Sequence, residues 1–150
     1  MPPTKHIKSI RLLNKKIRME PMYQNISNLQ NNEDKNYPVY EIKSLPDKQH
    51  LINTSDVLLV EYYATWCNPC NLIRPNFNRL WKKYNQPKVG VYIVKQNIDD
   101  NIDGISSKVG GVPCFHFWVK GKHYPELTTI GGDVEAVDKT LFNVLQTLNK

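Results

Sequence analysis

The sequence lacks long apolar runs. No stretch approaches the roughly 20 apolar residues that a membrane-spanning helix requires. The N-terminus also lacks the continuous apolar core of a secretion signal. We therefore expect neither a membrane-spanning helix nor a secretion signal.

Cysteine is scarce, with three residues in 150: Cys67, Cys70 and Cys114. An odd number without a secretion signal argues against a disulfide scaffold and for a reducing compartment, so we expect a cytoplasmic protein. A zinc site would need a second pair of ligands, and neither Cys114 nor the four histidines provide matched spacing. We expect no metal and no cofactor.

A strong charge of one sign is absent from most of the chain. The net charge is +6, but residues 1–36 hold seven basic against three acidic residues, and residues 37–150 hold thirteen against eleven. Because the longer part is nearly neutral, nucleic-acid binding is not expected. Arginine is also rare, with four against sixteen lysines and sixteen asparagines. This composition is typical of AT-rich genomes, including those of some large DNA viruses and some protists.

We predict two parts, a basic N-terminal extension at 1–36 and one domain at 37–150. In the extension, apolar residues recur near helical spacing among lysines and arginines: Ile7, Ile10, Leu13 and Ile17. We expect a solvated, partly disordered tail. The alternative is a short basic amphipathic helix that contacts a membrane surface, an anionic partner or a mitochondrial import receptor. Residues 20–36 are polar and aperiodic, as in a linker.

The apolar periodicity of residues 37–150 predicts alternating strands and helices. Strands are expected at 39–42, 57–63, 89–94, 114–119 and 127–130. Helices are expected after Ser44, over 67–84 with a bend near Pro75, over 101–108, and after Asp133. This order describes an α/β fold with a central mixed sheet and helices on both faces.

Cys67 and Cys70 fall where a buried strand is followed by a helix. A thiolate at a helix N-terminus faces unpaired backbone N–H groups and the positive end of the helix dipole, which lower its pKa. A separation of three residues places both sulfurs on one side of the first turn, close enough to bond. The pattern favours a redox-active pair; a structural disulfide and half of a zinc site are the alternatives.

The segment 60–70 resembles the active-site strand and turn of the thioredoxin family. Further likenesses follow in the family's order: Pro75 in the second helix, 95–99 at the end of the third strand, Gly111-Val112-Pro113 in the loop with the cis-proline, and Gly131 after the last strand. The resemblance covers residues 39–150. It implies the thioredoxin fold, a central mixed sheet flanked by helices on both faces.

The resemblance also implies a thiol–disulfide oxidoreductase that reduces protein disulfides. Cys67 would be the exposed nucleophile, and Cys70 the less exposed thiol that resolves the mixed disulfide. Glu61 stands where the family has a buried aspartate, and Lys95 matches that acid's lysine partner. Burial should raise the pKa of Glu61 and let it accept a proton from Cys70. A purely structural ion pair of Glu61 with Lys95 is the alternative.

In the family, the cis-proline loop faces the cysteine pair and binds extended substrates. Trp66, Gly111, Val112 and Gly131 would then form an apolar docking surface, with Pro113 in the cis form. An ordinary half-buried aromatic is the alternative for Trp66.

Two residues depart from the family pattern. Asn68 replaces the usual glycine between the cysteines, while the retained Pro69 favours a reducing protein over oxidising or isomerising relatives. Cys114 stands directly after Pro113, where the family often has threonine. It is either a small buried core residue or a third thiol that accepts the disulfide or becomes glutathionylated.

The resemblance implies partners of two kinds: proteins that contain disulfides, and a thioredoxin reductase or glutathione system that supplies electrons. One rival function is a disulfide oxidase or isomerase in virus assembly. Another is a non-catalytic binding or virion structural module. A virion and the mitochondrion are the alternative locations.

Overall fold

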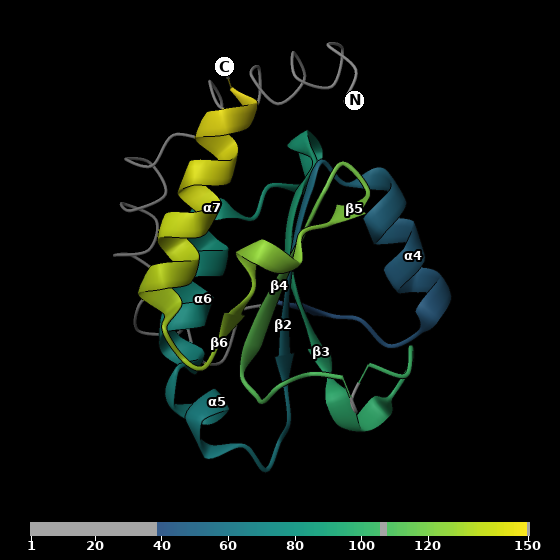
Figure 1. The fold of residues 1–150 in the computed structure, drawn as a ribbon, viewed down its shortest axis with the longest axis vertical. Coiled ribbons are helices and arrows are strands. Elements are labelled where there is room, and N and C mark those ends of the chain that lie inside the picture. Colours follow the sequence, from purple (N-terminus) through teal and green to yellow (C-terminus); the bar gives the residue numbers. More distant parts are fainter. Residues whose placement is uncertain (1–38, 106–107, 150) are drawn as a thin grey trace.

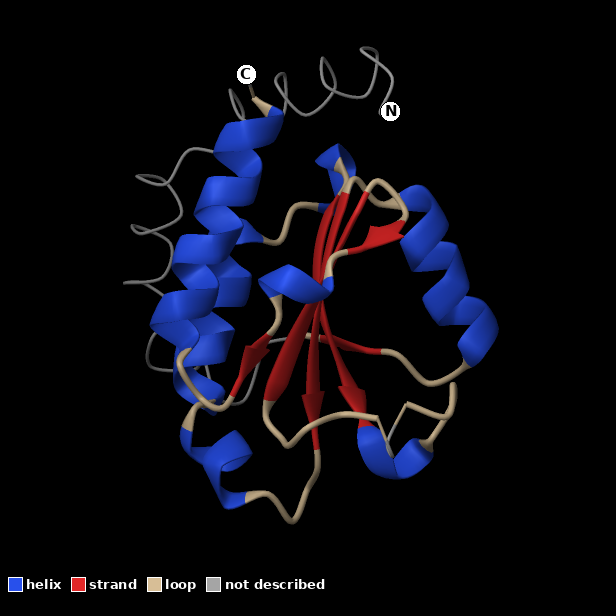
Figure 2. Ribbon diagram, in the orientation of Figure 1, coloured by secondary structure: helices blue, strands red, loops and turns tan. Residues whose placement is uncertain are grey.

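In the part of the chain that the structure describes, one sheet of six strands lies at the centre of the fold (Figures 1 and 2). The structure, a computed structural model, describes residues 39–105 and 108–149. Its strands follow the order β1-β3-β2-β4-β5, and β6 also pairs with β4. Their bounds are Tyr40–Glu41 (β1), Val57–Tyr63 (β2), Val91–Asn97 (β3), Cys114–Val119 (β4), Lys122–His123 (β5) and Thr129–Ile130 (β6). The first three strands are parallel, and β4 runs antiparallel to β2, so the sheet is mixed as predicted.

Helices cover both faces of the sheet, also as predicted. Figure 1 shows α4 on one side and α6 with α7 on the other. Their bounds are Leu45–Thr54 (α4), Asn68–Leu72 (α5), Arg74–Tyr84 (α6) and Val134–Leu148 (α7). No helix within the described ranges is long and apolar enough to cross a membrane. The predictions for residues 1–36 lie outside the described residues.

β2 is the central strand because its sequence is almost continuously apolar. Its first six residues are buried, and β3 and β4 flank it. Successive side chains of a strand point to opposite faces. Leu59 therefore packs into the core that contains the apolar faces of α6 and α7, whereas Leu58 and Val60 pack into the core that contains Leu51 of α4. The strand's carboxyl end then leads directly to the two cysteines.

The predicted helix caps are confirmed. The Ser44 side chain accepts a hydrogen bond from the Asp47 N–H at 3.3 Å, and the Asp133 carboxylate accepts one from the Ala136 N–H at 3.0 Å. Both bonds satisfy backbone donors of the first helical turn that have no partner within the helix.

The predicted helix 67–84 is two helices. It breaks at Ile73, which ends α5 and caps α6. Pro75 has no N–H to donate to the Asn71 carbonyl, and its ring crowds the preceding turn, so the chain starts a new helix there. This break leaves Cys67 and Cys70 on a helix of their own.

Three other predicted boundaries were wrong. The strand expected at 89–94 runs over Val91–Asn97, because Pro87–Val89 form a 3-10 turn that Gly90 closes at φ 83°. The helix expected over 101–108 is not formed at 101–105. A 3-10 helix at Ile98–Asp100 precedes this segment instead, and Asn101 closes it at φ 45°.

The strand expected at 127–130 is the third. Two short strands, β5 and β6, pair with opposite ends of β4, and the 3-10 helix Pro125–Leu127 separates them. The apolar pattern predicted one strand here but not this interruption.

Lys48 is a buried cation that the sequence did not predict. It is 3% exposed, and its Nζ lies 2.8 Å from the Tyr62 hydroxyl and 2.5 Å from Asp103 Oδ2. Burial lowers the pKa of Lys48, while the bond to Asp103 acts against that shift. This pair joins α4 to the segment after β3.

Replacing Lys48 with methionine should lower the free energy of unfolding by about 3 kcal/mol, because the Asp103 carboxylate loses its buried counter-charge. Denaturant unfolding measures this. The double variant Lys48→Met/Asp103→Asn should recover most of the loss. A single variant within about 0.5 kcal/mol of the wild type would contradict a stabilising role for the pair.

Candidate active site

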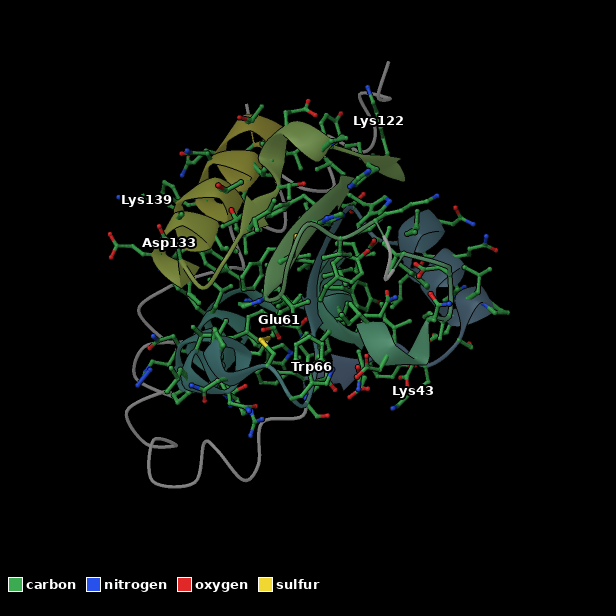
Figure 3. The ribbon with its side chains drawn as sticks, turned by 60° about the horizontal axis from the view of Figure 1, so that its bottom comes forward. Lys43, Glu61, Trp66, Lys122, Asp133 and Lys139 are labelled. Atoms are coloured by element: carbon green, nitrogen blue, oxygen red, sulfur yellow. A yellow bond between two sulfur atoms is a disulfide. The ribbon has the colours of Figure 1, made fainter. Side chains whose placement is uncertain are left out.

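The two cysteines lie at the end of the sheet where β2 stops. Cys67 caps α5, Cys70 lies in its first turn, and the two form a disulfide with a Cα–Cα distance of 5.3 Å (Figure 3). Ala64, Tyr63, Ile98 and Val112 pack against this pair. The pairing predicted from the sequence is therefore formed.

The predicted difference in exposure between the cysteines is absent in this disulfide form. Cys67 is 3% exposed and Cys70 is 5% exposed. Val112 packs against the pair, and its carbonyl oxygen lies 3.4 Å from Cys67 Sγ. The exposure expected for the nucleophile thus does not distinguish Cys67 in the oxidised protein.

Hydrogen bonding does distinguish the two sulfurs. The Cys70 N–H donates to Cys67 Sγ at 3.2 Å. This is the usual capping bond, in which a backbone N–H of the first helical turn donates to the side chain of the N-cap residue. Once the disulfide is reduced, this amide stabilises negative charge on Cys67. The geometry therefore favours Cys67 as the thiolate.

The loop opposite the disulfide has the shape that the resemblance implies. The Val112–Pro113 peptide bond is cis. The Gly131 N–H donates to the Pro113 carbonyl at 2.8 Å, with Gly131 at φ 100°, a conformation that favours glycine. The adjacent Gly132 was not singled out from the sequence. A β-carbon there would lie 2.9 Å from Ile73 Cγ2, so the loop and the helix break approach closely at this point.

Three large apolar side chains are exposed in this region. Two of them flank the cysteine pair in the sequence, and the third lies on β6, which pairs with the start of β4. Trp66, Leu72 and Ile130 are 65%, 71% and 63% exposed. Figure 3 shows Trp66 beside the disulfide, and its Nε1–H donates to Asp99 Oδ2 at 2.9 Å. Trp66 is therefore not the half-buried aromatic of the alternative interpretation. Leu72 and Ile130 were missed because exposure of an apolar residue leaves no signal in the sequence.

Glu61 lies near the disulfide, as Figure 3 shows, and lines a small cavity. Its side chain and that of Cys70 line this space of about 30 Å³, together with Val39, Tyr63, Asn71, Arg74, Phe77, Asn78 and Lys95. The volume is enough for about one water molecule, and several lining groups are polar. The cavity thus joins the carboxyl to the second cysteine.

Burial controls the acidity of Glu61. The residue is 5% exposed, and desolvation raises its pKa from 4.5 to about 8, although Lys95 and Arg74 each lower it. No cation of the described ranges lies within the 4 Å of an ion pair with Glu61. The predicted rise in the pKa of Glu61 is confirmed. The alternative, a direct structural ion pair of Glu61 with Lys95, is not found in the structure. Arg74, the second cation, was not predicted.

Cys114 is a buried free thiol. It is 1% exposed, forms no disulfide, and packs in the core that includes Leu58, Val60 and Tyr62. Burial raises the pKa of its thiol. These observations favour the small core residue over the glutathionylated third thiol.

Comparison with known proteins identifies the family. The family model described as thioredoxin matches residues 41–143, which include the cysteine pair, Glu61, Lys95 and the cis-proline loop. The chain belongs to the thioredoxin family. Its fold is the thioredoxin fold.

Curated relatives differ in length from this chain. Thioredoxin-T of Drosophila melanogaster is 33% identical over 92 residues, and the match covers 61% of this chain and 55% of that protein. Thioredoxin-like protein 1 of Schizosaccharomyces pombe is 40% identical over 95 residues, covering 60% and 31%. Thioredoxin of Sus scrofa is 31% identical over 106 residues, covering 69% of this chain and 95% of the relative. The chain thus spans about half or less of the first two relatives and nearly all of the third.

Solved structures agree with the fold. Oxidised mitochondrial thioredoxin 3 of Saccharomyces cerevisiae has a TM-score of 0.59 at 26% identity, covering 70% of this chain and 94% of that one. Thioredoxin NaTrxh of Nicotiana alata has a TM-score of 0.61 at 24% identity, covering 73% and 94%. With the cysteine pair in place, the domain is a thiol–disulfide oxidoreductase.

Proposed function

We propose that the protein reduces disulfides of other proteins in a reducing compartment, the cytoplasm. The observation that supports this most is the Cys67–Cys70 disulfide with a buried, proton-holding carboxyl behind it and exposed apolar side chains around it. The retained Pro69 fits the reducing direction. The roles of individual residues below belong to this proposal.

The first step is attack by Cys67. In the reduced protein, its thiolate attacks one sulfur of the substrate disulfide, and the second substrate sulfur leaves as a thiolate that takes a proton from water. A mixed disulfide then joins Cys67 to the substrate. The Cys70 amide, 3.2 Å from Cys67 Sγ in the oxidised protein, stabilises the attacking charge.

The second step releases the substrate. Cys70 gives its proton to the Glu61 carboxylate across the small cavity, and the new thiolate attacks Cys67 Sγ. The bond between Cys67 and the substrate breaks, the departing substrate sulfur takes a proton from water, and the substrate leaves as a dithiol. Glu61 returns its proton to water, and two electrons have passed from the pair to the substrate. The pair returns to the disulfide seen in the structure.

Two electrons from outside must reduce the pair again. Thioredoxins act with reductase systems, and we propose a thioredoxin reductase or a glutathione system here. One solved neighbour, at 25% identity and a TM-score of 0.59, concerns the thiol resolving mechanism in yeast mitochondrial 1-Cys peroxiredoxin via glutathione/thioredoxin systems.

Insulin reduction tests the function and its electron donor. The protein should cleave insulin disulfides catalytically when a thioredoxin reductase or reduced glutathione supplies electrons. A Cys114→Ala variant should keep this turnover, because Cys114 is buried in the core. Loss of turnover in that variant, with the fold intact by circular dichroism, would place Cys114 in the reaction. No turnover by the wild type with either donor would contradict the proposed function.

Substrate docking at Trp66 gives a separate prediction. Trp66→Ala should raise KM for a protein disulfide roughly tenfold and change kcat less, because exposed aromatic residues contribute strongly to interfaces. Phe142→Ala is the matched control, since Phe142 is an exposed aromatic on α7. Equal effects of the two substitutions would contradict docking at Trp66.

A further inference from the structure

Lys95 lies between two carboxyl-bearing residues in the sheet. The register places Glu41 of β1 directly opposite Lys95 of β3, and Lys95 directly opposite Glu61 of β2. Residues opposite one another on neighbouring strands share a face, and such strands lie about 4.8 Å apart. The buried carboxyl therefore has a second acid two strands away, on the far side of the same cation.

Glu41 is fixed in place by two donors. The Tyr63 hydroxyl donates to Glu41 Oε1 at 2.6 Å, and Lys43 Nζ lies 2.9 Å from Glu41 Oε2. Partial burial acts to raise the pKa of Glu41, but the bonds from Tyr63 and Lys43 outweigh it, and the pKa is lowered. Glu41 is therefore a charged carboxylate at neutral pH.

Lys95 is attracted by both acids and ion-paired to neither. Its Nζ lies 5.3 Å from the centre of the Tyr63 ring, and the described residues show no carboxylate within 4 Å of it. Its charge nevertheless lowers the pKa of Glu41 and that of Glu61. Tyr63 links the arrangement, because its ring supports Lys95 and its hydroxyl binds Glu41.

We propose that Glu41 is a positioning residue for proton transfer at the active site: with Tyr63, it holds Lys95 off Glu61, so that the buried carboxyl can carry a proton at neutral pH. The catalytic meaning of this inference rests on the proposed function. The arrangement itself does not.

The other groups around Glu61 cannot replace this effect. The titratable groups that line its cavity are Lys95 from β3, Arg74 from α6, Cys70 from α5 and Tyr63 from β2. A full ion pair with either cation would favour the ionised carboxylate and remove the proton. Arg74 donates to Asn71 Oδ1 at 2.8 Å and forms no ion pair with Glu61 within the described residues, and Glu41 provides the corresponding restraint on Lys95.

The test is the titration of the Glu61 carboxyl in Glu41→Gln, followed by carbon-13 NMR and assigned with Glu61→Gln. The pKa of Glu61 should fall by about 1, because removing the Glu41 charge ends a repulsion and frees Lys95 to approach Glu61. Glu126→Gln is the control: it removes a carboxylate charge at an exposed residue of the turn Pro125–Leu127, and should leave the pKa of Glu61 unchanged. An equal shift in both variants, no shift in Glu41→Gln, or a rise would overturn the proposal.

Two further variants test the route through Lys95. Tyr63→Phe keeps the ring and removes the hydroxyl that binds Glu41, so it should shift the pKa of Glu61 in the same direction by a smaller amount. In a Lys95→Met background, Glu41→Gln should have less than half of its original effect. An undiminished effect there would contradict positioning through Lys95. Because carboxyl titration requires no turnover, these outcomes stand whether or not insulin is reduced.

Discussion

Cys67→Ser should abolish disulfide reduction, whereas Cys70→Ser should remain joined to its substrates. A serine at position 67 cannot attack a disulfide sulfur, so no mixed disulfide forms. A serine at position 70 leaves the first attack intact and removes the thiol that resolves the intermediate. We expect a loss of turnover beyond the detection limit in both variants, with covalent complexes in Cys70→Ser alone.

Non-reducing electrophoresis and mass spectrometry of the captured species measure this difference. The double variant Cys67→Ser/Cys70→Ser is the control and should capture nothing. Complexes that form through Cys70 in Cys67→Ser would contradict the assignment, and would mean that the amide bonded to Cys67 Sγ does not select the nucleophile.

Glu61→Gln should slow the release of reduced substrate by about 100-fold near pH 7, the low end of what a positioned acid or base contributes. The first attack should change much less, because Cys67 does not depend on the Glu61 carboxylate. In the wild type, release should accelerate with pH, reach half of its maximum near pH 8, where Glu61 is half ionised, and level off above that pH. Stopped-flow measurement of both steps from pH 6 to 9 separates them. Unchanged release kinetics in the variant would leave Glu61 with a structural role.

The same substitution should change the pH dependence of stability. The pKa of Glu61 is about 8 in the folded protein against 4.5 ordinarily, so the folded state binds more protons than the unfolded chain between these values. Stability from this group is complete below about pH 4.5 and is lost as pH rises through 8. Glu61→Gln should therefore be more stable than the wild type at pH 9, on the order of a few kcal/mol, and little different at pH 4. A constant difference across this range would contradict the raised pKa.

The sequence predicted the central strand and both sides of the disulfide turn because these depend on local signals. The apolar run 57–63 fixed β2, and the caps Ser44 and Asp133 fixed two helix starts. The wrongly predicted boundaries lie where the chain changes direction within a few residues. Left-handed residues such as Gly90 and Asn101 end short 3-10 turns, and apolar periodicity does not report them.

The active site was predicted in part. The family resemblance indicated Glu61, but it did not indicate Arg74, which follows the helix break at Ile73 and lines the same cavity. The exposed side chains of Leu72 and Ile130 depend on how β6 and α5 pack, which is tertiary information. The row formed by Glu41, Lys95 and Glu61 likewise requires the register of three strands.

The reduction potential of the Cys67–Cys70 couple tests the central claim most directly. The protein is equilibrated with dithiothreitol or glutathione redox buffers, and the oxidised fraction is read from thiol alkylation. If the protein is a disulfide reductant, its cysteine pair should be a reversible two-electron couple with a potential of about −270 mV. A potential well above about −200 mV would contradict this claim and would indicate an oxidase or isomerase in virus assembly. A pair that does not cycle between disulfide and dithiol would also contradict it, and would indicate a binding or virion structural module.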